Sequence, residues 1–493
     1  MMNLYGKRGA CSGSVREPAI HLASRFQFPV SQALAAVLLL ALSGLSGCLN
    51  PGKGKTAYVG ATVIDGTGAP PILDGVIIVA DGRIEQIGPP DLVKVPRGAL
   101  EMRLDGRWVI PGLIDAHVHL ERWTLSRYLA YGITSVRSMG GNRDSVVALR
   151  NAILLGTENG PRLYISGPMV DGRPATWPGA TTVRNPNEAR RAVDDRVLLG
   201  ASQIKVYTKI DRRLLEPLMA EADDLHMPVA AHLGKIDAVT AARLGVRSIE
   251  HMSGVVESSL PDPSRLYRAH NDFFTGWRLS GRSWSALDSA ALDRTASALV
   301  ETDVAVVPTL VLHEAFGHLS DRDFIAQIDL AGVPTSVQEA WDVPDLIRRA
   351  GMRSADFAGF RASRSVQDRF LRIFRKAGGI VAAGSDSPNQ LLPPGASLHR
   401  ELELLVAAGL STEEALLAAT REAARILNSD TSGVLRPGAV ADFLVLSADP
   451  LEEITNTLLI ERLVLRGESY HPDEFKTDWE GWQAPTDTLD QGQ

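Results

Sequence analysis

Residues 111–120, PGLIDAHVHL, hold the pattern on which the fold of this chain depends. A short apolar run ends in two histidines, His117 and His119, that stand two positions apart. On a β-strand, residues two apart point to the same side, so both imidazoles would face one surface. In a barrel strand that surface is the interior. An HxH pair in isolation is only a weak indication of a metal site, and its meaning depends on the rest of the chain.

Four further residues that could bind metals stand at the ends of, or within, other apolar runs. They are Lys205 in QIKVYT, His232 in PVAAHL, His251 in SIEHM and Asp386 in AAGSDS. Each run is followed by a loop and a helical pattern. The strands of a (β/α)8 barrel deliver functional side chains to its C-terminal face in this way. The sequence therefore predicts an α/β protein built around a TIM barrel with a metal site at its mouth.

Candidate strands alternate with helical patterns through the middle of the chain, which predicts parallel pairing and closure into a barrel. The eight candidates are Trp108–Ile114, Ile133–Arg137, Leu163–Ser166, Gln203–Tyr207, Val229–His232, Ser248–His251, Ala305–Leu310 and Ile380–Gly384. Two of the helical patterns cover Asn187–Leu199 and Arg213–Leu225. The segments Val255–Thr302 and Leu312–Lys376 are too long for one helix each. We expect both segments to rise over the mouth of the barrel as walls or lids.

Both ends of the predicted folded region have a different texture, with short β-rich runs around Asp-Gly and Gly-Ala-Pro turns. This texture covers residues 57–88 and returns in GVLRPGAVADFLVLSADP and LIERLVLRGESY. We expect one small discontinuous β-sandwich, closed by both termini. The predicted domains are a signal peptide over residues 1–47, sandwich parts over residues 48–106 and 426–470, the barrel over residues 107–425 and a polar tail over residues 471–493.

The N-terminal segment combines basic residues with the apolar run ALAAVLLLAL at residues 33–42. A run of that length is short for a bilayer span but suits the core of a signal peptide. The sequence LSGC at residues 45–48 resembles a bacterial lipobox, in which Cys48 is lipidated; an uncleaved anchor is the alternative. By resemblance to other lipoproteins, Leu49 favours the outer membrane. We expect a lipid-anchored protein of the bacterial cell envelope that faces the periplasm or the exterior.

The composition is that of an ordinary globular protein, with 45% hydrophobic and 22% charged residues. A net charge of −7, without a basic patch carrying aromatic residues, argues against a nucleic-acid partner. The two cysteines are Cys11 and Cys48, and Cys11 falls in the predicted signal peptide. Burial alone must then stabilise the exported chain, without disulfides. The sequence leaves a homo-oligomer open.

Lys205 lies inside an apolar strand in which Ile204 and Val206 are expected to face the surrounding helices. Its ammonium group would be buried in the barrel at a high free-energy cost. Three arrangements are open: a carboxylate partner, reaction with CO₂ to an anionic carbamate that bridges two cations, or a side chain that reaches the mouth. Asp386 follows Gly384 closely and would be a metal ligand or a helix N-cap.

The order HxH, K, H, H, D at successive strand ends resembles the amidohydrolase superfamily, in its binuclear subtype with a carboxylated lysine. The resemblance extends from about Ala57 to Ser469, because GVLRPGAVADFLVLSADPLEEI also matches the family. The segments TSVRSMGG, IKVY and VRSIEHM are most similar to its imidazolonepropionase-like and prolidase-like branch.

The resemblance implies a catalytic centre with two divalent metal ions. Its six ligands would be His117, His119 and Asp386 for one metal, His232 and His251 for the other, and carboxylated Lys205 as the bridge. Zinc suits these donors best, although manganese, iron and cobalt fit them too. Two such ions can share a hydroxide at neutral pH, and Asp386 would serve as general base and then as general acid.

Candidate substrate contacts are less sharply defined. Tyr207 shares the interior face of its strand with Lys205, and would donate to a substrate carbonyl or pack at the rim. Lys235 would bind an anionic group or be a solvated loop residue, and His313 would contact substrate or be exposed. Arg137 would pair with an acidic neighbour or bind a ligand.

The function that follows is hydrolysis of C–N amide bonds in small molecules, most simply dipeptides or N-acyl amino acids. Arg268, Arg278 or Arg282 in the long segments would hold the carboxylate of such a substrate. A cyclic-amide or lactone hydrolase of the same superfamily is the alternative. A non-catalytic lipoprotein binding module is the second alternative, which loss of a metal ligand would favour; none is lost.

Overall fold

The computed structural model describes residues 51–476. The predicted signal peptide and the lipidation of Cys48 lie outside the described residues, as does most of the predicted polar tail. Of the tail, residues 471–476 are described: the 3-10 helix η3 (Pro472–Phe475) ends on Phe475, which is buried. Among the helices of residues 51–476, none is long and apolar enough to cross a membrane.

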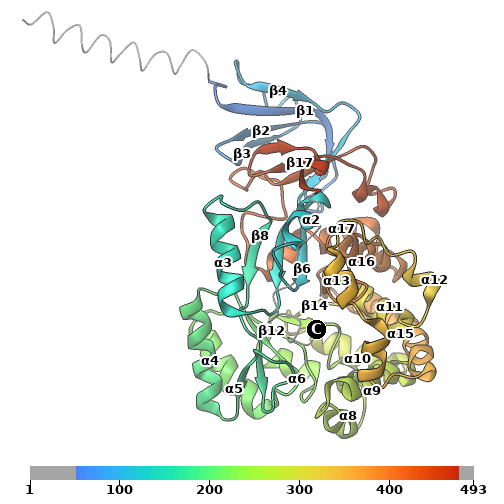
Figure 1. The fold of residues 1–493 in the computed structure, drawn as a ribbon. Helices are drawn as coiled ribbons and strands as arrows, with labels where there is room; N and C mark the ends of the chain where they lie inside the picture. Colours follow the sequence, from blue (N-terminus) through green and yellow to red (C-terminus); the bar gives the residue numbers. More distant parts are fainter. Residues whose placement is uncertain (1–50, 477–493) are drawn as a thin grey trace, which may run out of the picture. The chain divides into compact units, whose positions relative to one another are not determined.

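A barrel of parallel strands occupies the middle of the chain, as predicted (Figure 1). Its strands are β6 (Leu113–Val118), β7 (Ile133–Ser138), β8 (Arg162–Ile165) continued by β9 (Val170–Gly172), β11 (Ile204–Val206), β12 (Val229–Ala231), β13 (Ser248–Glu250), β14 (Ala305–Val307) and β15 (Ile380–Val381). Two hydrogen-bonded runs, β6-β7-β8 and β9-β11-β12-β13-β14-β15, make up the wall, with β10 (Thr181–Val183) added beside β9.

Backbone hydrogen bonds join the two runs at both seams. At one seam the amide of Ala116 donates to Ala383, and the amide of Asp386 donates to His117 at 2.8 Å. At the other seam the amide of Ser202 donates to the carbonyl of Ile165, also at 2.8 Å. The barrel is therefore closed.

Alternation within the strands separates the interior from the helical layer. Ile204 and Val206 on β11 are fully buried in the large core cluster, together with residues of α4 (Pro186–Leu199) and α5 (Arg212–Asp224). These helices match the predicted ranges to within a residue at each end. Lys205, between the two apolar residues, points the other way and lies inside the barrel, as its position in the strand predicts.

The first predicted strand, Trp108–Ile114, is wrong as a single element. Residues 108–111 form β5 (Trp108–Pro111), which pairs with β1 (Lys55–Val63) and β16 (Phe443–Leu446) in the terminal sheet, and the barrel strand β6 begins at Leu113. Gly112 stands at the junction, where an added Cβ would lie 2.3 Å from Oγ1 of Thr134. Only glycine allows the chain to pass so close to the neighbouring strand.

Both ends of the described chain build one mixed sheet. Its strand order is β18-β17-β16-β5-β1-β2-β3, with β4 beside β1. The strands not yet given are β2 (Ile72–Ala80), β3 (Arg83–Gly88), β4 (Leu100–Arg103), β17 (Ile460–Leu465) and β18 (Glu468–Tyr470). Tyr58 of β1 and Phe443 of β16 meet edge to face at 5.0 Å. The predicted sandwich is therefore a sheet joined through β5, whose two halves share one core.

The two long segments form helices that pack on one another. After β13 come α7 (Val255–Ser259), α8 (Ser264–Ala269), α9 (Phe273–Ser283) and α10 (Ser289–Val300), and after β14 come α11 (Leu310–His318), α12 (Arg322–Ile325), α13 (Thr335–Ala340), α14 (Val343–Arg349) and α15 (Ser354–Lys376). Gly281 of α9 is packed so tightly that an added Cβ would lie 2.1 Å from the ring of Phe360 on α15. Helices α9 and α15, one from each long segment, are therefore in direct contact.

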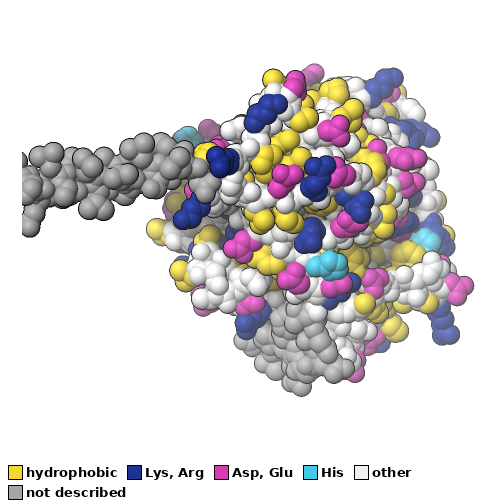
Figure 2. Space-filling view, turned by 90° about the horizontal axis from the view of Figure 1, so that it is seen from above, with side chains coloured by type: hydrophobic (Ala, Val, Ile, Leu, Met, Phe, Trp, Pro, Cys, Tyr) yellow, Lys and Arg dark blue, Asp and Glu magenta, His cyan; other side chains and the backbone are white. Residues whose placement is uncertain are grey.

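The face of the molecule seen in Figure 2 carries acidic and basic side chains in a mixed pattern, with hydrophobic side chains between them. No one sign of charge dominates that face. Large exposed leucines of the terminal sheet include Leu73 on β2 and Leu100 on β4.

Candidate metal centre

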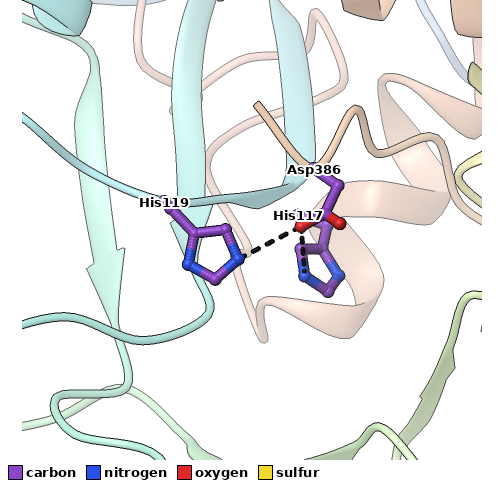
Figure 3. Close-up of side chains that lie close together, drawn as sticks. All are labelled: His117, His119 and Asp386. Carbon is purple, nitrogen blue, oxygen red and sulfur yellow. Dashed lines mark hydrogen bonds and ion pairs between the residues drawn. The ribbon is translucent and has the colours of Figure 1, made fainter. Parts of the chain in front are cut away.

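Three predicted ligands meet where β6 and β15 end. Oδ1 of Asp386 lies 3.2 Å from Nε2 of His117 and 3.1 Å from Nε2 of His119 (Figure 3). One ligand atom from each of the three residues fits within a group no more than 4.8 Å across, which suits a single metal ion. Gly384 makes this approach possible, because an added Cβ there would lie 2.8 Å from Cβ of His117.

The other two histidines lie beside this group. The imidazole of His251 is 4.5 Å from that of His117 and 4.7 Å from that of His232, measured between ring centroids. His232 directly follows β12 and His251 directly follows β13. His251 and Asp386 both adopt left-handed backbone conformations, with φ of 59° and 60°. Such strain in non-glycine residues is concentrated at functional sites.

The charge states of these residues are those that metal binding requires. Burial lowers the pKa of His232 and of His251 well below its usual value, so both rings are neutral at pH 7 and keep a free lone pair. Burial opposes ionisation of Asp386. The neighbouring His117, together with the hydrogen bonds from His117 and His119, outweighs it and holds the pKa of that carboxyl well below its usual range. Neutral imidazoles and an ionised carboxylate are metal donors.

Lys205 lines the same cavity as these residues. Its side chain is 1% exposed, and within residues 51–476 its Nζ has no hydrogen-bond partner. Burial lowers the pKa of this amine to about 8. Of the three arrangements open from the sequence, a direct carboxylate partner and an escape to solvent are not what the structure has. An unpartnered buried nitrogen among five metal-type ligands fits a metal-bridging group on Lys205.

A buried ion pair that the sequence analysis did not identify as part of the site supports His117. Nδ1 of His117 lies 2.7 Å from Oε2 of Glu250, and Nη2 of Arg137 donates to Oε1 of the same carboxylate at 2.8 Å. Burial raises the pKa of Glu250, but Arg137 and His117 outweigh it and leave the pKa at about 2. The carboxylate thus fixes the tautomer and orientation of His117.

A signal for Glu250 was present in the sequence. In β13, Ser248 and Glu250 alternate with apolar Ile249, so both polar side chains must enter the barrel. The expected pairing of Arg137 with an acidic neighbour is confirmed, since its partner is Glu250. His251 has a polar partner of its own, because its Nδ1 lies 2.7 Å from Oγ1 of Thr309.

A cavity of about 310 Å³ lies over the ligands. All six predicted ligands line it, together with the predicted substrate contact Tyr207. The Tyr207 hydroxyl accepts a hydrogen bond from Nε1 of Trp177 at 2.9 Å, and burial raises its pKa, so the hydroxyl keeps its proton. Tyr207 can therefore donate to a bound group.

The other two predicted substrate contacts are placed elsewhere. Nζ of Lys235 donates to the side chain of Asn271, and Lys235 does not line the cavity. The ring of His313 stacks on that of Trp277 at 5.4 Å, behind the cavity lining, with its Nε2 near the carbonyl of His251 at 3.2 Å. His313 is thus placed to hold the backbone carbonyl of His251, one of the predicted metal ligands.

Helices of the two long segments supply much of the cavity wall, as predicted. Phe273, Phe274 and Trp277 come from α9, and Leu312 and Phe316 come from α11. Their aromatic rings are in contact with one another, for example Phe273 with Trp277 at 6.2 Å. The predicted metal ligands therefore lie in a cavity whose wall carries apolar side chains from α9 and α11.

Comparison with known proteins places the chain in a family. A family model described as "Amidohydrolase family" matches residues 108–469. Imidazolonepropionase of Chromobacterium violaceum is 27% identical over 440 residues, which is 84% of this chain and 96% of that protein. Imidazolonepropionase of Stenotrophomonas maltophilia is 46% identical over a short match of 57 residues, and this chain spans 14% of its length.

Solved structures have the same fold. A putative prolidase from Bifidobacterium longum is 25% identical, with a TM-score of 0.63, over 88% of this chain and 97% of that chain. The match of the family model includes β5, the whole barrel and the returning strands β16 to β18 of the terminal sheet. The chain therefore belongs to the amidohydrolase family, in the branch of imidazolonepropionase and the prolidase-like proteins.

Proposed function

We propose that this chain hydrolyses C–N amide bonds of small molecules, dipeptides or N-acyl amino acids, with two divalent metal ions, most simply zinc. The observation that carries the proposal is the convergence of four histidines and Asp386 at one cavity with the buried Nζ of Lys205, which has no hydrogen-bond partner within residues 51–476. Fold alone would not support a reaction, but this donor set does.

The residues divide between two metal positions. His117, His119 and Asp386 would hold one ion, His232 and His251 the other, and Lys205, carboxylated by CO₂, would bridge them. Bound metal ions polarise a carbonyl and lower the pKa of water. The carbamate would also convert the cost of a buried ammonium into an attractive interaction with two cations.

Asp386 is the residue we assign to proton transfer. Its carboxylate is ionised and lies at the floor of the cavity, within reach of a bound substrate. It would accept a proton from the attacking water and deliver it to the leaving nitrogen, which must be protonated to depart as an amine. Tyr207 keeps its proton and would donate to the oxygen of the scissile carbonyl.

Cavity size supports a small substrate. A volume of about 310 Å³ is at the lower end of the range for small-molecule sites, roughly 300–1,000 Å³. The walls contributed by α9, α11 and α14 restrict access to the floor, so a folded protein would not reach the metals. A dipeptide or an N-acyl amino acid fits these dimensions.

A cyclic amide or lactone is the alternative substrate class. The likeness to imidazolonepropionase over 96% of that protein's length favours this alternative. The same residues would serve, because a ring amide also needs a polarised carbonyl and a proton for nitrogen. Both substrate classes imply an enzyme. The remaining alternative is a binding module without activity.

The test is turnover by the zinc-loaded protein, supplied with bicarbonate, on matched panels of dipeptides, N-acyl amino acids, lactones and cyclic amides. The proposal expects kcat/KM for dipeptides or N-acyl amino acids to exceed that for the other panels. Turnover confined to lactones or cyclic amides would select the alternative. A fully metallated protein inactive on all panels would favour the binding module.

The attachment of the protein to a membrane is a separate proposal that rests on the sequence. The run at residues 33–42 followed by LSGC supports lipidation at Cys48, with the folded unit facing the periplasm or the exterior. Cys48→Ala should leave the precursor unprocessed or release soluble protein. If mass spectrometry found an unmodified Cys48 in wild-type protein that is bound to the membrane, the lipobox assignment would be rejected.

A further inference from the structure

We propose that Arg143 binds the carboxylate of the substrate at the cavity and that the aromatic wall holds its acyl group, so that acylated amino acids with a free carboxylate and an apolar acyl group are preferred. This inference rests on the proposed amide hydrolysis and adds a specificity residue to it. Arg143 is the first residue of α3 (Arg143–Leu154), which follows β7.

Arg143 is singled out by the charges of the cavity. Among the residues that line the cavity, the only lysine is Lys205, and the only arginine is Arg143. Lys205 lies at the floor among the metal ligands. The acidic residues of the lining are Glu121 and Asp386. Apart from Lys205, Arg143 is therefore the cationic side chain of the described lining that could pair with a substrate carboxylate.

The arginines first considered for this role have other partners or lie away from the cavity. Arg278 and Arg282 of α9 both form ion pairs with Asp356, at 3.8 and 3.1 Å. Neither of them lines the cavity, and neither does Arg268. The long segments thus contribute the apolar wall and leave recognition of an anion to α3.

The Arg143 side chain is available for a ligand. It is exposed, and within residues 51–476 its guanidinium has neither an ion pair nor a hydrogen bond. The buried Arg196 lies nearby: burial lowers the pKa of its guanidinium, Asp195 raises it, and the charge of Arg143 lowers it. Arg196 itself donates to the carbonyl of Pro168, a lining residue, at 2.8 Å. A carboxylate that binds Arg143 would therefore displace no partner among residues 51–476.

The remaining surface selects for an apolar group. Trp177 contacts Phe273 at 5.0 Å, and Phe273 in turn contacts Phe274 at 5.3 Å, all three lining the cavity. An aromatic or long aliphatic acyl group would pack against these rings. The guanidinium supplies a bidentate donor of the kind that matches a carboxylate.

The probes are N-benzoylglycine and N-benzoylglycinamide, which differ only in the carboxylate and both carry an aromatic acyl group. Binding to the zinc-loaded protein is measured by calorimetry, and release of benzoate by chromatography. Wild type should bind the acid about 10- to 100-fold more tightly than the amide, the range for a hydrogen bond to a charged group. Arg143→Gln should remove this difference, and Arg143→Lys should restore part of it.

The control is Arg191→Gln on α4, which changes an exposed arginine that does not line the cavity and should leave the preference intact. Equal binding of the two probes by wild type would overturn the proposal, as would binding of neither. Acid-selective binding that survives in Arg143→Gln but is lost on removal of zinc would place the carboxylate on the metals instead. Arginine-dependent binding without release of benzoate would keep the assignment of Arg143 and count against the proposed hydrolysis.

Discussion

Oε2 of Glu250 lies 2.7 Å from Nδ1 of His117, while Nε2 of the same ring lies 3.2 Å from Asp386. One imidazole thus connects the centre of the barrel to the candidate metal site. The other oxygen of Glu250 accepts from Arg137, and all three side chains are almost completely buried. We therefore expect metal binding and the stability of the barrel core to be coupled through Glu250.

Glu250→Gln should weaken both properties. The substitution leaves the Arg137 guanidinium buried without a counter-ion, which costs about 3–5 kcal/mol of unfolding free energy. Glutamine also keeps only one acceptor oxygen where the carboxylate has two, so it cannot accept from both Arg137 and His117. Because His117 loses the charged partner that orients it, zinc affinity should fall by about 10- to 100-fold. Urea unfolding of the metal-free protein and zinc titration measure the two effects. Glu461→Gln, which breaks a half-exposed pair with Arg107, is the control and should change stability by less than about 1 kcal/mol.

Lys205→Ala should abolish binding of the pair of metals and with it the activity. Elemental analysis should find about two zinc ions per wild-type chain and fewer in the variant. Acetate or another short carboxylic acid should restore part of both, because it supplies the missing bridging oxygens. Lys376→Ala at the exposed end of α15 is the matched control. A wild-type protein that is fully active with one metal would contradict the binuclear assignment.

Asp386→Asn should slow turnover by a factor of about 10²–10⁴, because the amide cannot accept the proton that the carboxylate transfers. The far-ultraviolet circular dichroism spectrum and the melting temperature should show that the fold is retained. Asp293→Asn, on the exposed surface of α10, should leave turnover unchanged. An unaffected rate in a fully metallated Asp386→Asn protein would assign proton transfer to another group.

The free energy of unfolding should depend on pH through Glu401 on α16 (Ala396–Ala407). Burial raises the pKa of this carboxyl from 4.5 to about 8. The folded protein then keeps a proton that the unfolded chain loses above pH 4.5. Its contribution to stability is complete below that value and declines as the pH rises toward about 8.

Glu401→Gln should flatten this decline, because the amide oxygen can still accept from the backbone amide of Val311 and no longer titrates. Urea midpoints of the two proteins between pH 5 and 9 measure the change. Glu403→Gln on the same helix alters a partly buried residue paired with Arg400 and should leave the slope as it is. Identical slopes in wild type and Glu401→Gln would show that other groups determine it.

Most of the predicted ligands stand within or next to a strand, where the period of two indicates their direction, whereas Asp386 lies in the loop after β15. His117, Lys205 and His232 required only the local run of apolar residues around them. The barrel followed from the number of such runs. These features are local in the sequence. What tertiary structure adds is the pairing of the first and last strands that closes the barrel.

The parts that escaped prediction depend on contacts between distant segments. The pair of Arg137 and Glu250 spans two strands that are not neighbours in the barrel, and either residue alone has several satisfactory partners. The division at Gly112 reflects the side chain of Thr134, which no local pattern reveals. Arg143 belongs to the cavity only because α3 begins beside it. Tertiary packing decides each of these cases.

The central place of β5 in the terminal sheet constrains the order in which the protein can be made. β5 pairs with β1 on one side and with β16 on the other, and these partners are separated by most of the chain. A growing polypeptide therefore holds β5 with one open edge until the last part of the chain emerges. A product truncated before Phe443 would leave that edge unpaired, in a form prone to aggregation. The second edge of β5 can therefore be paired only after β16 has been synthesised.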